Sequence, residues 1–226
     1  MSLVALSAQL LLAVQRQAPT DDLLRQFRSV STDALAHELT TDHARLAFWI
    51  NLYNACYQLL VPRQSLASPQ VFRQAAIRFS DQTLSLDQVE HGILRRWRHR
   101  FGLGYVPQLL PPHVVRKLAV SKIDYRIHFA LNCGAKSCPP IRSYSADALH
   151  EQLALATTTF LASETQVDER KKVLCVTRLM LWFHGDFGGH AGIRAIHARH
   201  FGQDFTSYKI RFQPYDWSVL LRNFAP

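Results

Sequence analysis

Hydrophobic positions along the chain predict a protein built mainly from helices. Apolar side chains recur at helical spacing over residues 3–16 and 20–38, and Thr20 followed by two aspartates is typical of a helix N-terminus. Residues 43–61 are apolar on nearly every side, which predicts a buried helix, and Pro62 is expected to end it. The N-terminal part of the chain is therefore expected to be helical.

The rest of the chain alternates helical segments with short strands. Ser85 and Gln88 have the spacing of a capping box, which predicts a helix that continues to about residue 100. Further helices are expected over residues 145–162, 179–186 and 190–200, and strands over residues 126–132, 172–177 and 209–212. We expect these strands to form one small antiparallel sheet, so the predicted fold class is α+β.

Composition and charge narrow the class of protein. The chain has 226 residues, of which 48% are hydrophobic and 19% charged, so it can bury a substantial core. Its net charge of +9 raises the question of nucleic acid, but the basic residues are scattered apart from one cluster at residues 95–100. This cluster is interpreted as a solvated helix face, and no nucleic-acid partner is expected.

Cellular location follows from what the sequence does not contain. No window reaches the roughly 18 apolar residues of a membrane span, and residues 2–14 lack the positive start of an export signal. A chain of this size does not need disulfides for stability, so its four cysteines are expected to be reduced. The prediction is a cytoplasmic protein without a membrane partner; the sequence assigns no oligomeric state.

Candidate chemistry is concentrated in residues 124–140, which carry one histidine and two cysteines. Alternation along the expected strand places His128 and Cys133 on opposite faces, which argues against a dyad and assigns Cys133 to the core. Cys138 follows in a polar loop beside Lys136, where a nearby cation favours the thiolate. Cys138 is therefore the better nucleophile candidate, with an inert cysteine in a turn as the alternative.

A thiolate nucleophile needs a base, and a transition state needs hydrogen-bond donors. His91, in the apolar half of the capped helix, is either this base or a core histidine. Glu90 precedes it and diverges from it by about 100° on a helix, so direct orientation of His91 by Glu90 is not expected. Asn51 and Asn54 interrupt the buried helix and either hold a neighbouring loop or donate to an oxyanion.

Metal binding and a disulfide are alternative roles for the same two cysteines. Cys133 and Cys138 are spaced more loosely than the cysteines of a zinc knuckle, and no second Cys/His pair lies nearby. A disulfide between them is possible but requires an oxidising setting. No metal and no cofactor are expected.

Four segments, taken together and in this order, resemble the domain of unknown function 547 family. They are residues 47–54 (AFWINLYN), 85–95 (SLDQVEHGILR), 126–140 (RIHFALNCGAKSCPP) and 215–218 (YDWS). The Asp186-Phe187 element fits as well. The resemblance covers roughly residues 44–218, so we expect an N-terminal helical extension over residues 1–40 and one domain over residues 41–226. Ser218 is followed by Val-Leu where the family has Leu-Asn, which leaves the C-terminal motif without an assigned role.

The resemblance implies a papain- or transglutaminase-like cysteine-hydrolase fold with a Glu-His-Cys site. By position this site consists of Glu90, His91 and one cysteine of the third segment, for which the facing argument selects Cys138. His128 is the second-choice base, and Asn51, Asn54 and Cys133 are expected in supporting or substrate-binding positions.

The expected function is a cysteine-dependent hydrolase or acyl transferase that acts on an amide or thioester bond of a peptide or small molecule. The alternative is a non-catalytic binding module whose cysteine-lined pocket holds a peptide or a small thiol compound.

Overall fold

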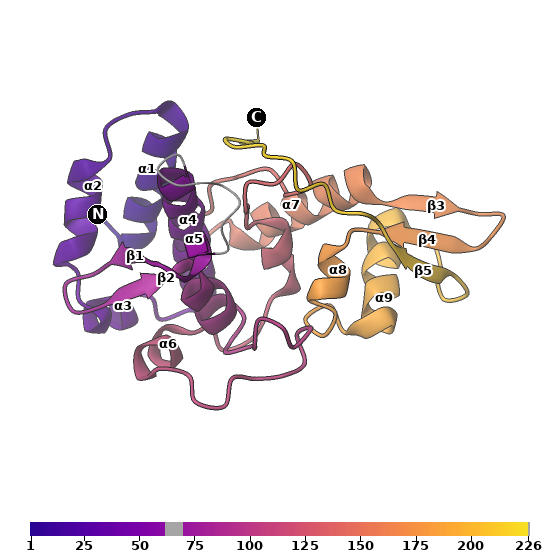
Figure 1. The fold of residues 1–226 in the computed structure, drawn as a ribbon, viewed down its shortest axis with the longest axis horizontal. Coiled ribbons are helices and arrows are strands. Elements are labelled where there is room, and N and C mark those ends of the chain that lie inside the picture. The colour runs from indigo at the N-terminus through magenta and orange to yellow at the C-terminus, as the bar shows by residue number, and fades with distance from the viewer. Residues whose placement is uncertain (62–69, 226) are drawn as a thin grey trace.

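Helices predominate in the described part of the fold, and two small sheets complete it there (Figure 1). A computed structural model describes residues 1–61 and 70–225. The predicted α+β class is confirmed. Pro62, the expected end of the buried helix, lies outside the described residues.

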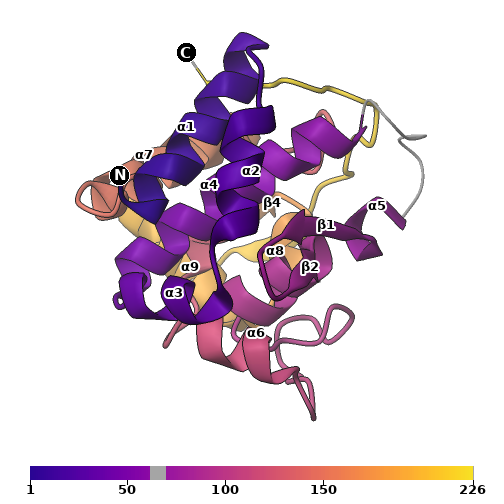
Figure 2. The ribbon, with the colours of Figure 1, turned by 90° about the vertical axis from the view of Figure 1, so that its left-hand side faces the viewer.

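The N-terminal part of the chain is a group of four helices, seen from their outer side in Figure 2. They are α1 (Leu3–Arg16), α2 (Asp21–Ser29), α3 (Thr32–Glu38) and α4 (Asp42–Leu60). The single helix expected over residues 20–38 is two helices, because Ser31 turns extended and caps α3 by accepting a hydrogen bond from the Ala34 N–H at 3.1 Å. Thr20 stands at the N-cap of α2 but makes no capping bond with its side chain.

Helix α4 is the centre of this group. It is buried continuously from Leu46 to Gln58, as its all-round apolar pattern predicted. Helix α1 packs along α4 and contributes Leu6, Leu10 and Leu11 to the same hydrophobic core. The N-terminal helices and α4 therefore share one core.

The strands form two sheets rather than the one expected. An unpredicted antiparallel hairpin joins β1 (Ala75–Arg78) to β2 (Thr83–Ser85). The second sheet has the order β3 (Gln166–Asp168), β4 (Val173–Val176), β5 (Lys209–Phe212). Strands β3 and β4 are antiparallel, but β4 and β5 are parallel because two helices carry the chain back between them. A small antiparallel sheet is thus present, as expected, but the described residues contain a second sheet, and that one is mixed.

The remaining helices connect and cover these sheets. They are α5 (Gln70–Arg73), α6 (His113–Leu118), α7 (Leu149–Glu164), α8 (Leu179–Trp182) and α9 (Gly189–Phe201). Helix α7 contacts both α4 and α9, so it links the N-terminal core to a second core around β4 and α9. Helices α7 and α8 are shorter than predicted, starting at Leu149 rather than Ser145 and ending at Trp182 rather than Asp186.

The predicted capping box exists and opens an unusual helix. The Ser85 N–H donates to Gln88 Oε1 at 2.9 Å, and the Gln88 N–H donates to Ser85 Oγ at 3.2 Å. The following helix, η2 (Gln88–Leu94), is a π-helix, a wide turn that is frequent at functional sites. It ends at Leu94 instead of residue 100, because Arg96 and Trp97 take left-handed backbone angles (φ 45° and 63°).

The strand expected over residues 126–132 is also wrong. Residues 125–129 form a short 3-10 helix, η3 (Tyr125–Phe129). Asp124 starts it by accepting a hydrogen bond from the Arg126 N–H at 3.0 Å, a local bond that competes with strand pairing. The alternating pattern was misleading, since Ile127, His128 and Phe129 are all buried.

Candidate active site

A pocket of about 530 Å³ brings most of the predicted residues together. It is lined from α4, η2, the loop after η3, α8 and the C-terminal segment. Its wall includes the predicted residues Glu90, His91, His128, Cys133 and Cys138. Because residues 126–132 are not a strand, the argument that His128 and Cys133 face opposite ways does not hold: both line this pocket.

The two cysteines are direct neighbours at the pocket wall. Their sulfurs are 2.7 Å apart, and both thiols are free. The Cys133 N–H donates to Cys138 Sγ at 3.1 Å, and the hydroxyl of Tyr215 lies 3.1 Å from the same sulfur. The Cys138 sulfur is thus surrounded by hydrogen-bond donors.

These contacts separate the two thiols in acidity. Burial raises the pKa of Cys138, but hydrogen bonds from the Cys133 thiol, the Tyr215 hydroxyl and the Cys133 N–H outweigh it and bring the pKa to about 7. The hydrogen bond to Cys138, followed by burial, holds the pKa of Cys133 well above its usual range. Lys136, the expected cation, pairs instead with Asp216 at 3.5 Å. Cys138 is therefore the more acidic of the two thiols, and neutral hydrogen-bond donors rather than a lysine lower its pKa.

The cysteine loop is held by its own backbone and by Asn132. Asn132 Nδ2 donates to the Pro139 carbonyl at 2.8 Å, and its Oδ1 accepts from the Gly134 N–H at 2.8 Å. Gly134 has φ +76°, and a Cβ there would lie 2.7 Å from the Tyr57 hydroxyl oxygen. A glycine is required at this position for both reasons.

Asn51 and Asn54 support the site from behind and do not line the pocket. Asn54 Nδ2 donates to the Ala130 carbonyl at 2.9 Å, and its Oδ1 accepts from the Asn132 N–H at 3.0 Å. Asn51 makes the equivalent pair of bonds with the backbone of Tyr144, at 2.8 and 2.9 Å. Because the side-chain amides of Asn51 and Asn54 are bonded to the backbone, their donation to an oxyanion is not supported. Both residues hold neighbouring loops.

The C-terminal segment closes over the cysteine loop. The Lys136 N–H donates to the Ser218 carbonyl at 2.8 Å, and the Leu220 N–H donates to the Gly134 carbonyl at 2.8 Å. These are backbone bonds, so the Val-Leu departure after Ser218 leaves them intact. They place the hydroxyl of Tyr215, from the C-terminal motif that had no assigned role, beside the sulfur of Cys138.

His91 is held by Arg95, the first residue of the basic cluster that was expected to be a solvated helix face; Arg95 is instead fully buried. Nδ1 of His91 lies 2.8 Å from Nη1 of Arg95, and because a guanidinium only donates, this nitrogen accepts and the ring proton sits on Nε2. Burial and the Arg95 charge lower the pKa of His91 to about 3. Glu90 comes no closer than 3.8 Å to His91 and accepts a hydrogen bond from the Tyr53 hydroxyl at 3.0 Å.

His128 contacts a carboxylate, whereas His91 contacts a guanidinium. Nε2 of His128 lies 2.9 Å from Oδ2 of Asp186, and its ring stacks on Phe183 with centroids 3.9 Å apart. Burial raises the pKa of Asp186, but hydrogen bonds and charge from His128 and Arg95 bring it below its usual range, so the carboxylate is ionised and Nε2 donates. Burial lowers the pKa of His128, against the opposing effect of Asp186, which leaves a neutral ring with Nδ1 unprotonated.

Asp186 joins the two histidine environments. Its side chain is fully buried, and its Oδ2 also accepts from Nε of the equally buried Arg95 side chain at 2.5 Å. Gly104 makes room for this carboxylate, since a Cβ there would lie 2.6 Å from Asp186 Oδ1. For Arg95, a sequence signal was available: it lies four residues after His91, at helical contact distance.

No metal site and no membrane-spanning helix were found in the described part of the chain. Among residues 1–61 and 70–225, no group of three or more His, Cys, Asp or Glu side chains is arranged to hold a metal ion. The helices described there are too short or too polar to cross a bilayer.

The fold and pocket together define an α+β protein in which a buried thiol of lowered pKa and a histidine paired with an aspartate line the same pocket. The family model described as "Protein of unknown function, DUF547" matches residues 37–161, more than half of the chain, and the chain belongs to this family. No curated protein and no solved structure matches it. The matched segment contains η2 and the cysteine loop and ends before Asp186 and Tyr215.

Proposed function

We propose that this protein is a cysteine-dependent hydrolase or acyl transferase that acts on an amide or thioester bond, and that its core is papain-like. The observation that carries the proposal is the state of Cys138: its sulfur lines a pocket of about 530 Å³ and its pKa is lowered to about 7 despite burial. Burial alone raises the pKa of a thiol. It raises the pKa of Cys56, for example, to about 12. A lowered thiol pKa in a cleft is typical of a nucleophile.

The base is one of two histidines, and the hydrogen bonds favour His128. Its Nδ1 is free to accept a proton while Asp186 fixes the ring, which is the orientation that a carboxylate gives a catalytic histidine. His91, the base that the resemblance implies, uses Nδ1 to accept from Arg95 and presents an N–H at Nε2. Among the described residues no histidine nitrogen is within hydrogen-bond distance of Cys138 Sγ, so proton transfer would require the contact to tighten on substrate binding or to pass through water.

The proposed reaction uses the groups around the sulfur in two steps. The Cys138 thiolate attacks the carbonyl carbon, a C–S bond forms, and the carbonyl π electrons move to oxygen. The Tyr215 hydroxyl and the Nε2–H of His91 are the proposed donors to this oxyanion. The oxyanion collapses and expels the amine or thiolate, which leaves with the proton that His128 received from the thiol. Water, or a second nucleophile in a transferase, then attacks the thioester and releases Cys138.

The pocket wall supports a substrate with an apolar or aromatic group. Tyr215, Trp182 and Trp217 pack together with ring centroids 4.6 to 5.4 Å apart along one side. Such a surface fits an aromatic or aliphatic side chain of a peptide, or the acyl part of a small thioester. A reducing compartment such as the cytoplasm is part of the proposal, because two thiols 2.7 Å apart stay reduced only there.

One observation favours a non-catalytic binding module as second candidate. The Tyr215 hydroxyl, rather than a histidine, occupies the position beside the sulfur, so the thiolate could serve to bind a ligand instead of attacking it.

Alkylation by iodoacetamide followed by peptide mass spectrometry tests the nucleophile. We expect the rate at Cys138 to follow a pKa of about 7 and to be absent at that peptide in Cys138→Ser. A rate that follows the ordinary value of about 8.5 would remove the basis of the proposal. Aryl thioesters and peptide anilides then separate the two candidates: an enzyme accumulates an acyl group on Cys138 and turns over, whereas a binding module does neither.

A further inference from the structure

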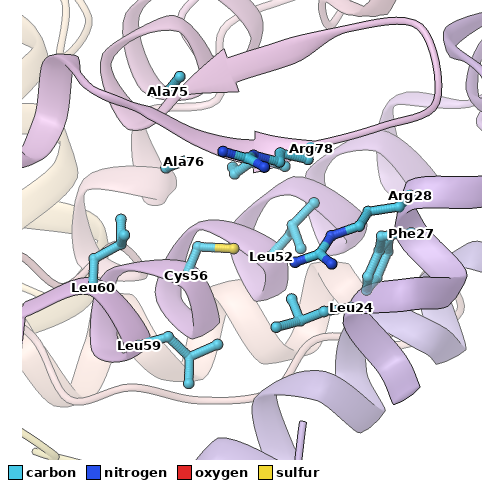
Figure 3. A pocket seen from close by; sticks show the side chains of 11 residues that line it. Leu24, Phe27, Arg28, Leu52, Cys56, Leu59, Leu60, Ala75, Ala76 and Arg78 are labelled. Carbon is cyan, nitrogen blue, oxygen red and sulfur yellow. The ribbon is translucent and has the colours of Figure 1, made fainter. Parts of the chain in front are cut away.

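A second pocket lies away from the cysteine site, between α2, α4 and β1 (Figure 3). Its volume is about 320 Å³, at the lower end of the roughly 300–1,000 Å³ that small-molecule sites occupy. It shares no lining residue with the pocket at Cys138. The proposed hydrolase reaction does not use it.

The floor of this second pocket is apolar and chemically inert. Leu52, Leu59 and Leu60 come from α4 and Leu24 from α2. Cys56 points into the same space, but burial raises its pKa to about 12, so its thiol is not ionised at neutral pH. The pocket is therefore suited to binding an aliphatic group rather than to chemistry.

Two arginines reach over this floor. Arg28 extends from α2 and Arg78 from β1, both from the same end of the pocket toward its middle (Figure 3). Neither guanidinium has an ion pair or hydrogen bond with any residue of the described ranges, whereas Arg25, one turn earlier on α2, pairs with Asp22. Two unneutralised cations beside an apolar cavity create a positive potential that a carboxylate would satisfy through forked N–H···O bonds.

We propose that this pocket binds a small amphipathic carboxylate, such as a short- to medium-chain fatty acid. The aliphatic chain would lie on Leu52, Leu59 and Cys56, and the carboxylate would sit between Arg28 and Arg78. A neutral ligand would leave the two charges unmatched, and a purely ionic one would leave the half-buried Leu24, Leu59 and Leu60 uncovered. This site is independent of the proposed function at Cys138.

Isothermal titration calorimetry of the full chain with decanoate tests the proposal. We expect binding with one ligand per chain, and a loss of affinity of about tenfold in Arg28→Gln and again in Arg78→Gln, as for one charge-assisted hydrogen bond lost each time. Decanol, which has the same chain and no charge, should bind weakly and equally to all variants. Arg25→Gln removes the same charge from the same helix and should leave the affinity for decanoate unchanged.

Three results would overturn the proposal. The first is no heat of binding with decanoate. The second is an affinity that falls equally in Arg25→Gln, which would indicate an effect of net charge only. The third is an affinity that survives both pocket variants but falls in Trp182→Ala, which would place the ligand in the pocket at Cys138. Thermal denaturation of each variant verifies that it is folded.

Discussion

The hydroxyl of Tyr215 lies 3.1 Å from the sulfur of Cys138, although the two residues are 77 positions apart in the chain. The bond joins the cysteine loop to the segment that follows β5, and it is one of the contacts that lower the pKa of Cys138. Among the residues that the structure describes, the Cys138 sulfur is contacted by a tyrosine hydroxyl, a second thiol and a backbone N–H, and by no cation.

Tyr215→Phe should raise the pKa of Cys138. Removal of one hydrogen bond to a charged group costs about 1.5–3 kcal/mol, which corresponds to about one to two pKa units. The pH profile of iodoacetamide alkylation should shift upward by that amount. Tyr144→Phe is the matched control, because its buried hydroxyl has no hydrogen-bond partner in the described structure; an equal shift in both variants would contradict the assignment.

Variants of the two histidines should separate their roles. If His128 is the base, His128→Ala should lower the rate of acylation of Cys138 by about 10²–10⁴-fold, and Asp186→Asn should lower it through misorientation of the ring. His91→Gln keeps an acceptor for Arg95 and should have a smaller effect, because it removes one proposed donor to the oxyanion. Stopped-flow measurement of thioester cleavage gives the rate of each variant. A larger loss of rate in His91→Gln than in His128→Ala would assign the role of base to His91.

Mild oxidation should link Cys133 to Cys138. Their sulfurs are 2.7 Å apart, so a disulfide requires only a small movement. With diamide, which accepts the two hydrogens, we expect a mass loss of two hydrogens in the peptide that carries both cysteines and full loss of alkylation at Cys138, restored by dithiothreitol. In Cys133→Ser the Cys138 thiol has no partner and should stay free under the same treatment. If Cys138 of this variant loses alkylation without gaining mass from another adduct, a Cys133–Cys138 disulfide is not the cause, and the prediction fails.

Gly134→Ala should destabilise the fold more than a left-handed backbone alone accounts for. Gly202 is the matched control, since it has φ +66° with no atom within 4 Å of an added Cβ, so Gly202→Ala costs only about 1–2 kcal/mol. At Gly134 a Cβ would also collide with the Tyr57 hydroxyl at 2.7 Å, and we expect at least about 1 kcal/mol more. If Gly134→Ala and Gly202→Ala lower the free energy of unfolding in urea equally, the cysteine loop accommodates the added Cβ, and the prediction fails.

Stability should fall as the pH falls below about 6.5. The pKa of His91 is lowered from 6.5 to about 3 in the folded chain. Between pH 6.5 and about 3 the unfolded chain therefore binds a proton at this position and the folded chain does not. The free energy of unfolding decreases as the pH falls through this window. The lowered pKa of His128 acts in the same direction. His91→Gln should flatten the pH dependence measured by urea denaturation, whereas His43→Gln, at an exposed position, should not.

The sequence predicted the long helices and the fold class well, because these depend on local periodicity. Residues 43–61 were recognised as a buried helix from their composition alone, and α4 occupies Asp42–Leu60. The prediction failed where a few local bonds override the pattern: Asp124 turned an apparently alternating strand into η3, and Ser31 divided one helix into two.

The candidate site was predicted only as far as its residues lie in short motifs. Cys138 was preferred over Cys133 through a strand that does not exist; its low pKa comes instead from Cys133 and Tyr215. Asp186 contacts Arg95 and His128 across 91 and 58 positions, and no local pattern reports such distances. Asn51 and Asn54 were correctly recognised as buried amides that need partners, but which partners they have depends on the folded chain.

The closure of the C-terminal segment over the cysteine loop has a consequence for how reactivity arises. Tyr215 follows β5 by a few residues, and β5 joins the sheet only through its parallel pairing with β4. Until that strand is docked, Cys138 lacks the Tyr215 hydroxyl and keeps only the donors of its own loop, so its pKa is higher than in the folded chain. An incompletely folded chain, or one clipped after β5, therefore carries the complete cysteine loop without the full set of donors that lowers the pKa of Cys138.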